Sequence, residues 1–338
     1  MFALENKKSK KTIIILIVIL FLIAGLILGG YLYAKSLLGN AERIELDEED
    51  LGIETVVEET TVYEGKEEET LPQTEKLPDG IINIALFGLD TRDMESNKGR
   101  SDAILVVTAD TVHNKIKVTS FARDSYVSID GYGKTKLTHA YIYGGPQLAV
   151  KTLNQNFGLN IEDFASVNFS QLASMIDFLG GVRLNVTEAE LKVMQEYFEE
   201  LNRIGVETEP LTETGDVLLT GGQAVAYARN RYTGSDVDRM NRQYEVLLAM
   251  AESAKNLKVT QYDDFVKMIL SECTISLTDK EIFSLGMWAL KNSPEICRYV
   301  LPNDECRAGG KMIGGRWYFV FDNMETVRKN LRSFIFEN

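Results

Sequence analysis

The chain has 338 residues, of which 45% are hydrophobic, so it is long enough to bury one large core or two ordinary ones. Most of its formal net charge of -14 at pH 7 lies in one segment, and the rest of the chain is mildly acidic, which argues against a nucleic-acid-binding surface. The only two histidines, His113 and His139, leave little material for a histidine-built zinc site or a Ser-His-Asp triad.

Residues 12–34 form an uncharged apolar run of the length that a bilayer-spanning helix needs. Four lysines lie just before it, within residues 1–11, and Lys35 alone follows directly. Because basic flanks stay in the cytoplasm, we expect a single-pass protein of the cell membrane, with a cytoplasmic tail (1–11) and everything past residue 35 outside. The alternative is a cleaved signal peptide, but the run is longer than a usual apolar region of that kind and no A-x-A site follows.

Most of the acidity lies in one segment. Residues 41–75 hold fourteen Asp or Glu against Arg43 and Lys66, a net charge of -12 out of -14. Such a composition cannot bury a core, so we expect residues 35–78 to be a flexible tether.

Three strands are predicted at the start of the outer domain, which we place at 79–338. Residues 81–87 and 104–108 are apolar runs of strand length, and 115–121 alternates between apolar and polar residues. Short connections favour an antiparallel meander.

In that meander Asp90, Asp102 and Arg123 should meet at one end of the sheet. Two carboxylates with no histidine near them in sequence suit Mg²⁺, which prefers oxygen ligands and often bridges to phosphates. Arg123 would then hold a phosphate directly. The alternative is that both aspartates only cap turns at strand ends. Asp110, at the opposite end of the hairpin, should tolerate replacement by alanine.

Later segments switch to the helical period, with short strands between them. Helices are expected at 147–156, 171–178, 188–201, 222–228, 237–255, 280–289 and 324–334, and strands at 182–186, 298–301 and 317–321. This order is typical of a single α/β domain of three layers, in which helices cover a central mixed sheet that begins as the meander.

Three cysteines, Cys273, Cys297 and Cys306, fall in the part expected outside, where disulfides form. Cys297 and Cys306 would be the natural pair. Three reduced thiols remain the alternative.

Four arginines surround the start of the predicted 237–255 helix: Arg229, Arg231, Arg239 and Arg242. Ser235 is expected to cap this helix, with Asp238 three residues further on. A helix start disfavours cations, because its unpaired N–H groups and the positive end of its dipole lie there. An anion would remove the conflict, so the cluster indicates a phosphate site. The alternative is a solvated face on which the arginines pair with nearby acids.

Several motifs together resemble the LytR-CpsA-Psr (LCP) family. The motifs are Gly88-Leu89-Asp90-Thr91-Arg92, Gly99-Arg100-Ser101-Asp102, Ala122-Arg123-Asp124-Ser125-Tyr126, Lys136-Leu137-Thr138-His139 with Gly144-Gly145, Leu179-Gly180-Gly181-Val182 and Tyr227-Ala228-Arg229-Asn230-Arg231. The match runs from about residue 80 to 255.

The resemblance implies a phosphotransferase that moves an anionic glycopolymer, such as a teichoic acid or a capsular polysaccharide, from an undecaprenyl pyrophosphate carrier to peptidoglycan. It implies that Asp90 and Asp102 bind Mg²⁺ and act with Arg123 in catalysis. Arg123, Arg229, Arg231 and either Arg239 or Arg242 would grip the pyrophosphate, while Arg100 and Arg92 match motif positions of less defined role. It also suggests that apolar residues line a slot for the polyprenyl tail: Phe157, Phe164, Val167, Phe169, Leu172, Ile176 and Phe178.

Two other functions stay open. One is a non-catalytic envelope regulator that binds lipid-linked intermediates. The other is a lipid pyrophosphatase, in which water replaces the acceptor. The presence of every charged motif residue favours the transferase, because a pure binder has no need of the metal pair.

Overall fold

The computed structural model describes residues 42–53, 79–91, 98–254 and 256–337. The predicted tail (1–11) and membrane helix (12–34) lie outside the described residues, as do Arg92 and most of the predicted tether. No helix within the described ranges is both long and apolar enough to cross a bilayer.

A seven-stranded mixed sheet forms the centre of the domain, in the order β1-β10-β7-β2-β3-β4-β11. Its strands are β1 (Glu42–Arg43), β2 (Ile81–Asp90), β3 (Arg100–Asp110), β4 (Lys115–Phe121), β7 (Ile161–Asn168), β10 (Thr274–Ile275) and β11 (Glu295–Leu301). β2, β3 and β4 pair antiparallel in chain order, which confirms the predicted meander. β7 joins β2 and β11 joins β4 in parallel, so the sheet is mixed as expected.

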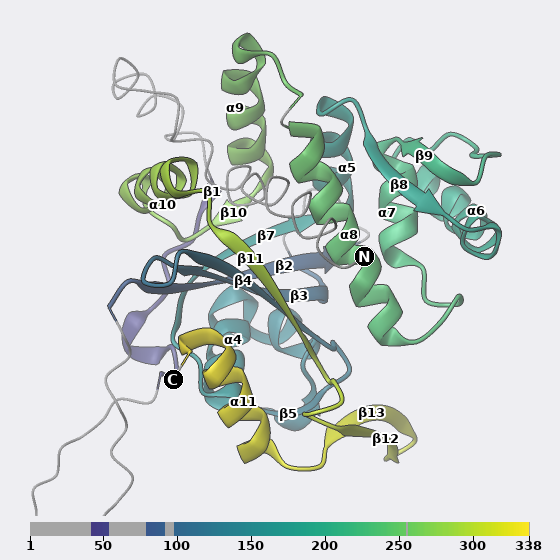
Figure 1. Ribbon diagram of the computed structural model, residues 1–338. Helices are drawn as coiled ribbons and strands as arrows, with labels where there is room; N and C mark the ends of the chain where they lie inside the picture. The colour runs from purple at the N-terminus through teal and green to yellow at the C-terminus, as the bar shows by residue number, and fades with distance from the viewer. Residues whose placement is uncertain (1–41, 54–78, 92–97, 255, 338) are drawn as a thin grey trace, which may run out of the picture.

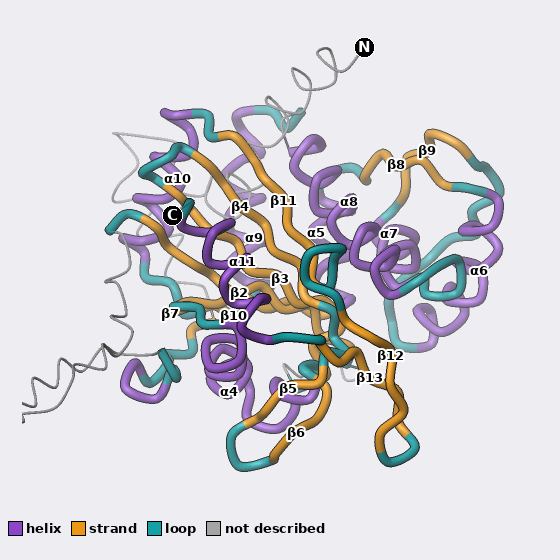
Figure 2. The backbone as a smooth tube through the Cα atoms, turned by 60° about the horizontal axis from the view of Figure 1, so that its bottom comes forward, coloured by secondary structure: helices purple, strands orange, loops and turns teal. Residues whose placement is uncertain are grey.

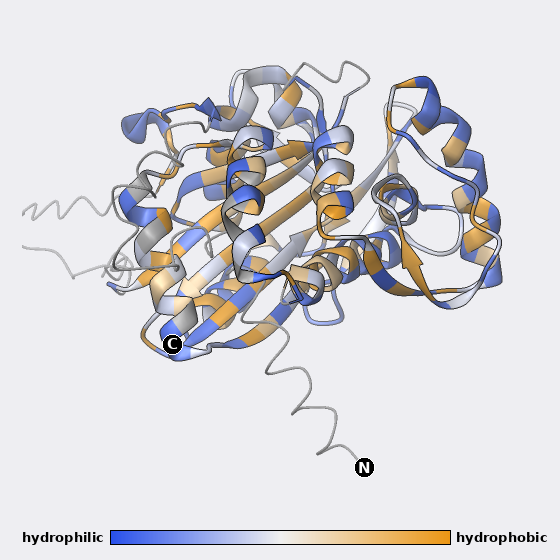
Figure 3. Ribbon diagram, turned by 90° about the horizontal axis from the view of Figure 1, so that it is seen from above, coloured by the Kyte–Doolittle hydropathy of each residue, from blue (hydrophilic) through white to orange (hydrophobic). Residues whose placement is uncertain are grey.

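Helices cover both faces of this sheet and make three layers (Figure 1). They are α4 (His139–Phe157), α5 (Phe169–Phe178), α6 (Glu188–Arg203), α7 (Gly221–Arg229), α8 (Asp236–Ala254), α9 (Tyr262–Glu272), α10 (Asp279–Asn292) and α11 (Met324–Phe336), with a 3-10 turn at Val259–Gln261. The side chains of β2 and β3 alternate between the two cores, as a strand's period of two requires. Ile84 and Leu105 pack with α5, α8 and α9, whereas Phe87 and Val106 pack with α4 and α11. Apolar strands under helices with polar outer sides are visible in Figure 3.

Three two-stranded hairpins lie outside the sheet. They are β5 (Tyr126–Ile129) with β6 (Gly133–Lys136), β8 (Val182–Val186) with β9 (Gly215–Leu219), and β12 (Ala308–Ile313) with β13 (Arg316–Phe321). The β8–β9 hairpin forms a lobe with α6 and α7, while β5–β6 and β12–β13 project from one end of the sheet (Figure 2).

Part of the predicted tether belongs to the domain, which corrects the expected boundary at residue 79. β1 extends the sheet, and the turn at Glu48–Asp50 contacts α4, where Lys151 pairs with Asp50 and Gln147 donates a hydrogen bond to the Asp50 carbonyl oxygen. Leu51 is buried, and Asn154 donates a hydrogen bond to its carbonyl oxygen over 2.9 Å. The segment folds because it carries apolar residues among its acids, which a count of charge alone overlooks.

Asp110 is not a position that tolerates alanine, contrary to the prediction from its place in the hairpin. Its carboxylate is fully buried and accepts hydrogen bonds from Lys117 at 2.6 Å and from the backbone of His113 at 2.8 Å. Alanine would leave the buried Lys117 ammonium without this partner, which costs stability. His113 and Glu337 lie close to Asp110. The ammonium group of Lys117 pairs with both carboxylates, Asp110 and Glu337, and offsets their negative charge.

Cys273, Cys297 and Cys306 are free thiols in the structure. The predicted disulfide between Cys297 and Cys306 is absent, in agreement with the alternative of three reduced thiols.

Candidate active site

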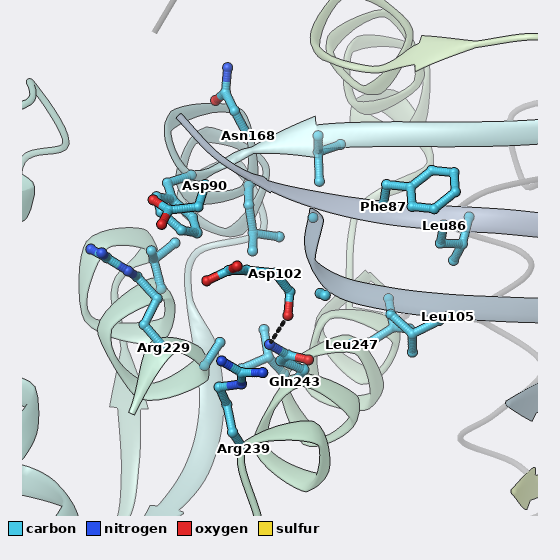
Figure 4. Close-up of a pocket in the computed structure, with 18 of the residues that line it drawn as sticks. Leu86, Phe87, Asp90, Asp102, Leu105, Asn168, Arg229, Arg239, Gln243 and Leu247 are labelled. Atoms are coloured by element: carbon cyan, nitrogen blue, oxygen red, sulfur yellow. Dashed lines mark hydrogen bonds between the residues drawn. The ribbon is translucent and has the colours of Figure 1, made fainter. Parts of the chain in front are cut away.

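One cavity, of about 440 Å³, opens where β2 ends and β3 begins, beside α5, α7 and α8. Asp90 and Asp102 lie on its wall with Arg100, Arg123, Arg229, Arg231 and Arg239. The meander therefore brings the two carboxylates and Arg123 to one place, as the strand directions predict. Figure 4 shows Asp90, Asp102, Arg229 and Arg239 facing the same space from different elements.

A β-bulge aims Asp102 into the cavity. Gly88 pairs with Ala103 but Leu89 pairs with Ser101, so Asp102 is the extra residue on β3. Such a bulge bends the strand and redirects a side chain. Just before β3, Gly99 lies against the end of β2, because a Cβ on Gly99 would lie 2.8 Å from the Asp90 carbonyl oxygen. This close approach gives a physical reason for glycine in the Gly99-Arg100-Ser101-Asp102 motif.

The two carboxylates repel each other. Burial raises the pKa of Asp90, and the negative charge of Asp102 raises it further. One Asp102 oxygen is hydrogen-bonded to Arg123, while the other, Oδ1, is buried without a hydrogen-bond partner. A cation between Asp90 and Asp102 would satisfy that oxygen and relieve the repulsion, so this pair fits a metal ion.

Arg239 is the most deeply buried of the arginines on the wall. Its side chain is 2% exposed, and the Nε and Nη1 atoms of its guanidinium group are buried without a hydrogen-bond partner. Asp236 lies 2.6 Å from it as an ion-pair partner, yet burial still lowers the pKa of the guanidinium. A buried cation with unused donors is costly on its own, so the site favours an anionic ligand.

Arg229 and Arg123 add further donors. Arg229 lies over the ring of Phe169 and beside that of Tyr197, and pairs with Glu200 over 3.2 Å. Its Nη1 and the Nε of Arg123 are buried without a hydrogen-bond partner. Aromatic stacking holds the Arg229 plane in place and leaves its edge free for a phosphate.

The remaining predicted arginines differ in whether they line the cavity. Arg100 and Arg231 are exposed and line the cavity. Arg242 does not line it. Its Nε donates to Glu190 over 2.7 Å, and its other nitrogens donate to the carbonyl oxygens of Asn230 and Thr233. Of the two alternatives for the last position, the structure thus brings Arg239 to the cavity and uses Arg242 to hold the 230–233 loop.

The other wall of the cavity is apolar. It consists mainly of Leu86, Leu105, Ala165, Leu172, Met175, Val225, Val246, Leu247 and Met250. Of the apolar residues suggested by the resemblance, Val167, Phe169 and Leu172 line the cavity, whereas Phe157, Phe164 and Ile176 are buried in the cores. A polar end and an apolar remainder suit an amphiphile with an anionic head.

A model of the LytR_cpsA_psr family matches residues 51–333. The chain belongs to this family. It is 30% identical over 312 residues to the polyisoprenyl-teichoic acid–peptidoglycan teichoic acid transferase TagU of Bacillus cereus, an alignment that covers 90% of this chain and 91% of TagU. It is also 33% identical over 213 residues to the regulatory protein MsrR of Staphylococcus aureus, with 62% and 60% of the two chains covered.

Solved structures of family members share the fold. The crystal structure of Bacillus subtilis TagT aligns with a TM-score of 0.59 and 25% identity over 78% of this chain and 95% of that one. A TagT structure with bound octaprenyl pyrophosphate lipid aligns with a TM-score of 0.58 and 24% identity over 78% and 94%. The three-layer arrangement around the mixed sheet is therefore the family's architecture.

Several cavity residues carry little or no signal in the sequence. Gln243 lies one helical turn after Arg239 on α8, and it donates to the Asp102 carbonyl oxygen over 3.4 Å. The sequence signal for Gln243 is its spacing of four residues from Arg239, which places the two side chains on the same face of a helix. Tyr197 and Glu200 share a face of α6, but nothing in their spacing distinguishes them from an ordinary amphipathic helix.

Replacing Arg242 should damage the fold rather than the chemistry. In Arg242→Met, Glu190 loses its partner in an ion pair whose side chains are 7% and 12% exposed. We expect the free energy of unfolding to fall by about 3 kcal/mol. The matched control is Arg183→Met, which breaks an exposed pair with Asp216 and should cost less than about 1 kcal/mol. Urea unfolding of the full chain in detergent checks both, and equal losses would contradict the structural role.

Proposed function

We propose that the chain is a membrane-anchored phosphotransferase, which moves an anionic glycopolymer from an undecaprenyl pyrophosphate carrier to peptidoglycan. The polymer is of the teichoic acid or capsular polysaccharide class. The names of TagU and TagT support this assignment. The single observation that carries it is the division of one cavity into an end with five arginines and two aspartates and a remainder of aliphatic side chains. A pyrophosphate with a polyprenyl tail has the same division.

The arginines act by binding and neutralising phosphate oxygens. Arg123, Arg229 and Arg239 have buried N–H groups without protein acceptors, and planar guanidinium groups match such oxygens in pairs. An acceptor hydroxyl attacks the phosphorus that bears the polymer, its proton leaves, and the bond to the bridging oxygen breaks. Polyprenyl phosphate departs, and the arginines stabilise the charge that develops on it.

Asp90 and Asp102 would hold Mg²⁺ in this proposal. The unpartnered Oδ1 of Asp102 and the raised pKa of Asp90 support it. When bound, the ion would supply positive charge next to the phosphoryl oxygens.

The full chain in detergent should form a phosphodiester when it is incubated with a lipid pyrophosphate glycan, peptidoglycan fragments and Mg²⁺. Mass spectrometry of the fragments detects the product. Release of the free phosphorylated polymer in place of this product would mean a pyrophosphatase. Binding of the lipid without any turnover would mean a regulator, the role in the name of MsrR.

The proposal includes an anchor at residues 12–34 with the N-terminus inside, because lysines precede an uncharged apolar run. Protease added to intact cells stripped of their wall should degrade the chain beyond residue 35. Protection of that region would refute both the orientation and a function at the wall. A cytoplasmic protein of the same cells serves as the control and should stay intact.

A further inference from the structure

On the proposed function, the hydroxyl that attacks the phosphorus must give up its proton, and a group on the cavity wall must accept it. Of the described residues that line the cavity, three carry a carboxylate, Asp90, Asp102 and Glu200, and none is a histidine. Asp90 and Asp102 serve the metal in that proposal. Tyrosines also line the cavity, but a phenol keeps its proton at neutral pH and has no free site for a second one. Glu200 is therefore the group available to accept the proton.

Glu200 lies beside the place where the pyrophosphate would bind. Its Oε1 atom is 3.2 Å from Nη2 of Arg229, whose other terminal nitrogen, Nη1, is buried without a hydrogen-bond partner. Arg229 thus contacts the carboxylate through one nitrogen and can donate from the other to a phosphate oxygen. Figure 4 shows the Arg229 guanidinium on the same side of the cavity as Asp90. A phosphate bound to Arg229 would have Glu200 within one guanidinium group of it.

The ion pair with Glu200 is not needed to hold Arg229. The Cζ atom of Arg229 already lies 4.5 and 5.0 Å from the ring centroids of Phe169 and Tyr197. The Glu200 side chain is 32% exposed, and ion pairs with that access to water contribute little to stability. A negative charge beside an anion site also weakens binding of the anion. A site for binding alone would gain nothing from this carboxylate, which indicates a role for Glu200 in the reaction.

The fold holds Glu200 in place from below. Phe198 and Leu201, which flank it on α6, are buried in the core that α6 shares with α7. The start of α6 is fixed by a reciprocal cap, in which Thr187 and Glu190 exchange hydrogen bonds of 3.0 and 3.3 Å. A carboxylate on a packed helix keeps its position better than one on a loop.

The cavity is open to solvent beside Glu200. Tyr197, three residues earlier on α6, stacks with Tyr232, with ring centroids 6.5 Å apart and an interplanar angle of 29°. Tyr232 lines the cavity and is 70% exposed. Because the lipid tail would fill the aliphatic remainder, the acceptor enters from this open side. The apolar face of a sugar ring can pack on Tyr232, which brings the hydroxyl groups of the sugar next to Glu200.

We propose that Glu200 is the general base of the transfer. The acceptor oxygen forms a bond to the phosphorus while its proton passes to a carboxylate oxygen of Glu200. The bond from the phosphorus to the bridging oxygen breaks, and its electron pair leaves with the polyprenyl phosphate. A phosphate bound to Arg229 competes for the guanidinium and so frees the carboxylate to accept the proton. The proton then passes from Glu200 to solvent.

Glu200→Gln tests this role, because the amide keeps the size of the side chain but does not accept the proton. Turnover at saturating acceptor should fall by about 10² to 10⁴, the usual contribution of a general base. Binding of polyprenyl pyrophosphate, measured by titration calorimetry on the full chain in detergent, should be at least as tight as in the wild type, since a repelling charge is gone. Glu199→Gln, the exposed neighbour on α6, should match the wild type in both measurements.

Formate should restore part of the turnover in Glu200→Ala, whose short side chain leaves room for it, but not in Glu200→Gln. Failure of formate to restore Glu200→Ala would make Glu200 a binding group for the acceptor and overturn the base. Near wild-type turnover in Glu200→Gln would also overturn it. Donor binding that weakens in step with turnover would make Glu200 a support for Arg229 instead.

Failure of the proposed function gives a different result. If the wild type releases phosphorylated polymer and forms no phosphodiester, water has replaced the acceptor. Glu200→Gln should then slow this release by the same factor, because water gives its proton to the same group, and this outcome refutes the transfer but keeps the base. Transfer that is equally fast in the wild type and in Glu200→Gln refutes the base but keeps the transfer. A wild type without any turnover would refute both.

Discussion

Arg239→Lys should give a folded chain that transfers polymer at least about a hundredfold more slowly, and Arg123→Lys and Arg229→Lys should do the same. Lysine keeps the charge but loses the planar pair of donors that matches a phosphate. Removing one preorganised donor to a developing negative charge costs about 10² to 10³ in rate. The loss should be largest at Arg239, since two of its nitrogens, Nε and Nη1, are buried without a hydrogen-bond partner, against one in Arg123 and one in Arg229. Single-turnover transfer, measured on the same preparations as the melting temperature, checks this.

The matched control is Arg183→Lys on the β8–β9 hairpin. Its ion pair with Asp216 is 3.4 Å long, with side chains 60% and 71% exposed, and such pairs contribute about 0 to 1 kcal/mol. Transfer and melting temperature should both stay near wild type. Near wild-type transfer in all three cavity variants would refute the pyrophosphate site. Unfolding in all three would make these arginines structural.

The sequence predicts the meander and its consequences well, because they depend on local patterns. Apolar runs joined by short turns require antiparallel neighbours, and this alone brings Asp90, Asp102 and Arg123 to one end of the sheet. The start of α8 is equally local. Ser235 and Asp238 form the predicted reciprocal cap, with hydrogen bonds of 2.6 and 3.3 Å.

The features that the sequence does not predict depend on distant partners. β7 lies between β2 and β10, so its residues 161–168 are stabilised by pairing on both sides rather than by a strict alternation. Arg239 and Arg242 are three residues apart on one helix. Arg242 turns from the cavity because it is bound by Glu190, 52 positions away, and by the 230–233 loop. The bulge at Asp102 likewise appears only in the register of two strands.

Asp90→Asn and Asp102→Asn should both abolish transfer, but they should change stability in opposite directions. The folded state raises the pKa of Asp90 above its ordinary value of 3.8. The native chain therefore holds this proton more tightly than the unfolded chain. That contribution to stability is complete below the ordinary pKa and is lost as the pH rises through the raised one. At pH 7 without metal, Asn at position 90 removes a buried, repelled charge, so the melting temperature should rise by a few degrees.

Asp102 differs because it is the ion-pair partner of Arg123, whose side chain is 14% exposed. Asn at position 102 weakens that pair and should lower the melting temperature. Mg²⁺ should raise the melting temperature of the wild type, since a ligand that binds only the folded state stabilises it, and it should have no effect on either variant. Differential scanning calorimetry of the full chain, with and without Mg²⁺, measures these shifts. Asp216→Asn, on an exposed carboxylate, should behave as the wild type. If Mg²⁺ raised the melting temperature of both cavity variants as much as that of the wild type, Asp90 and Asp102 would not be the metal ligands, whatever the activity of the variants.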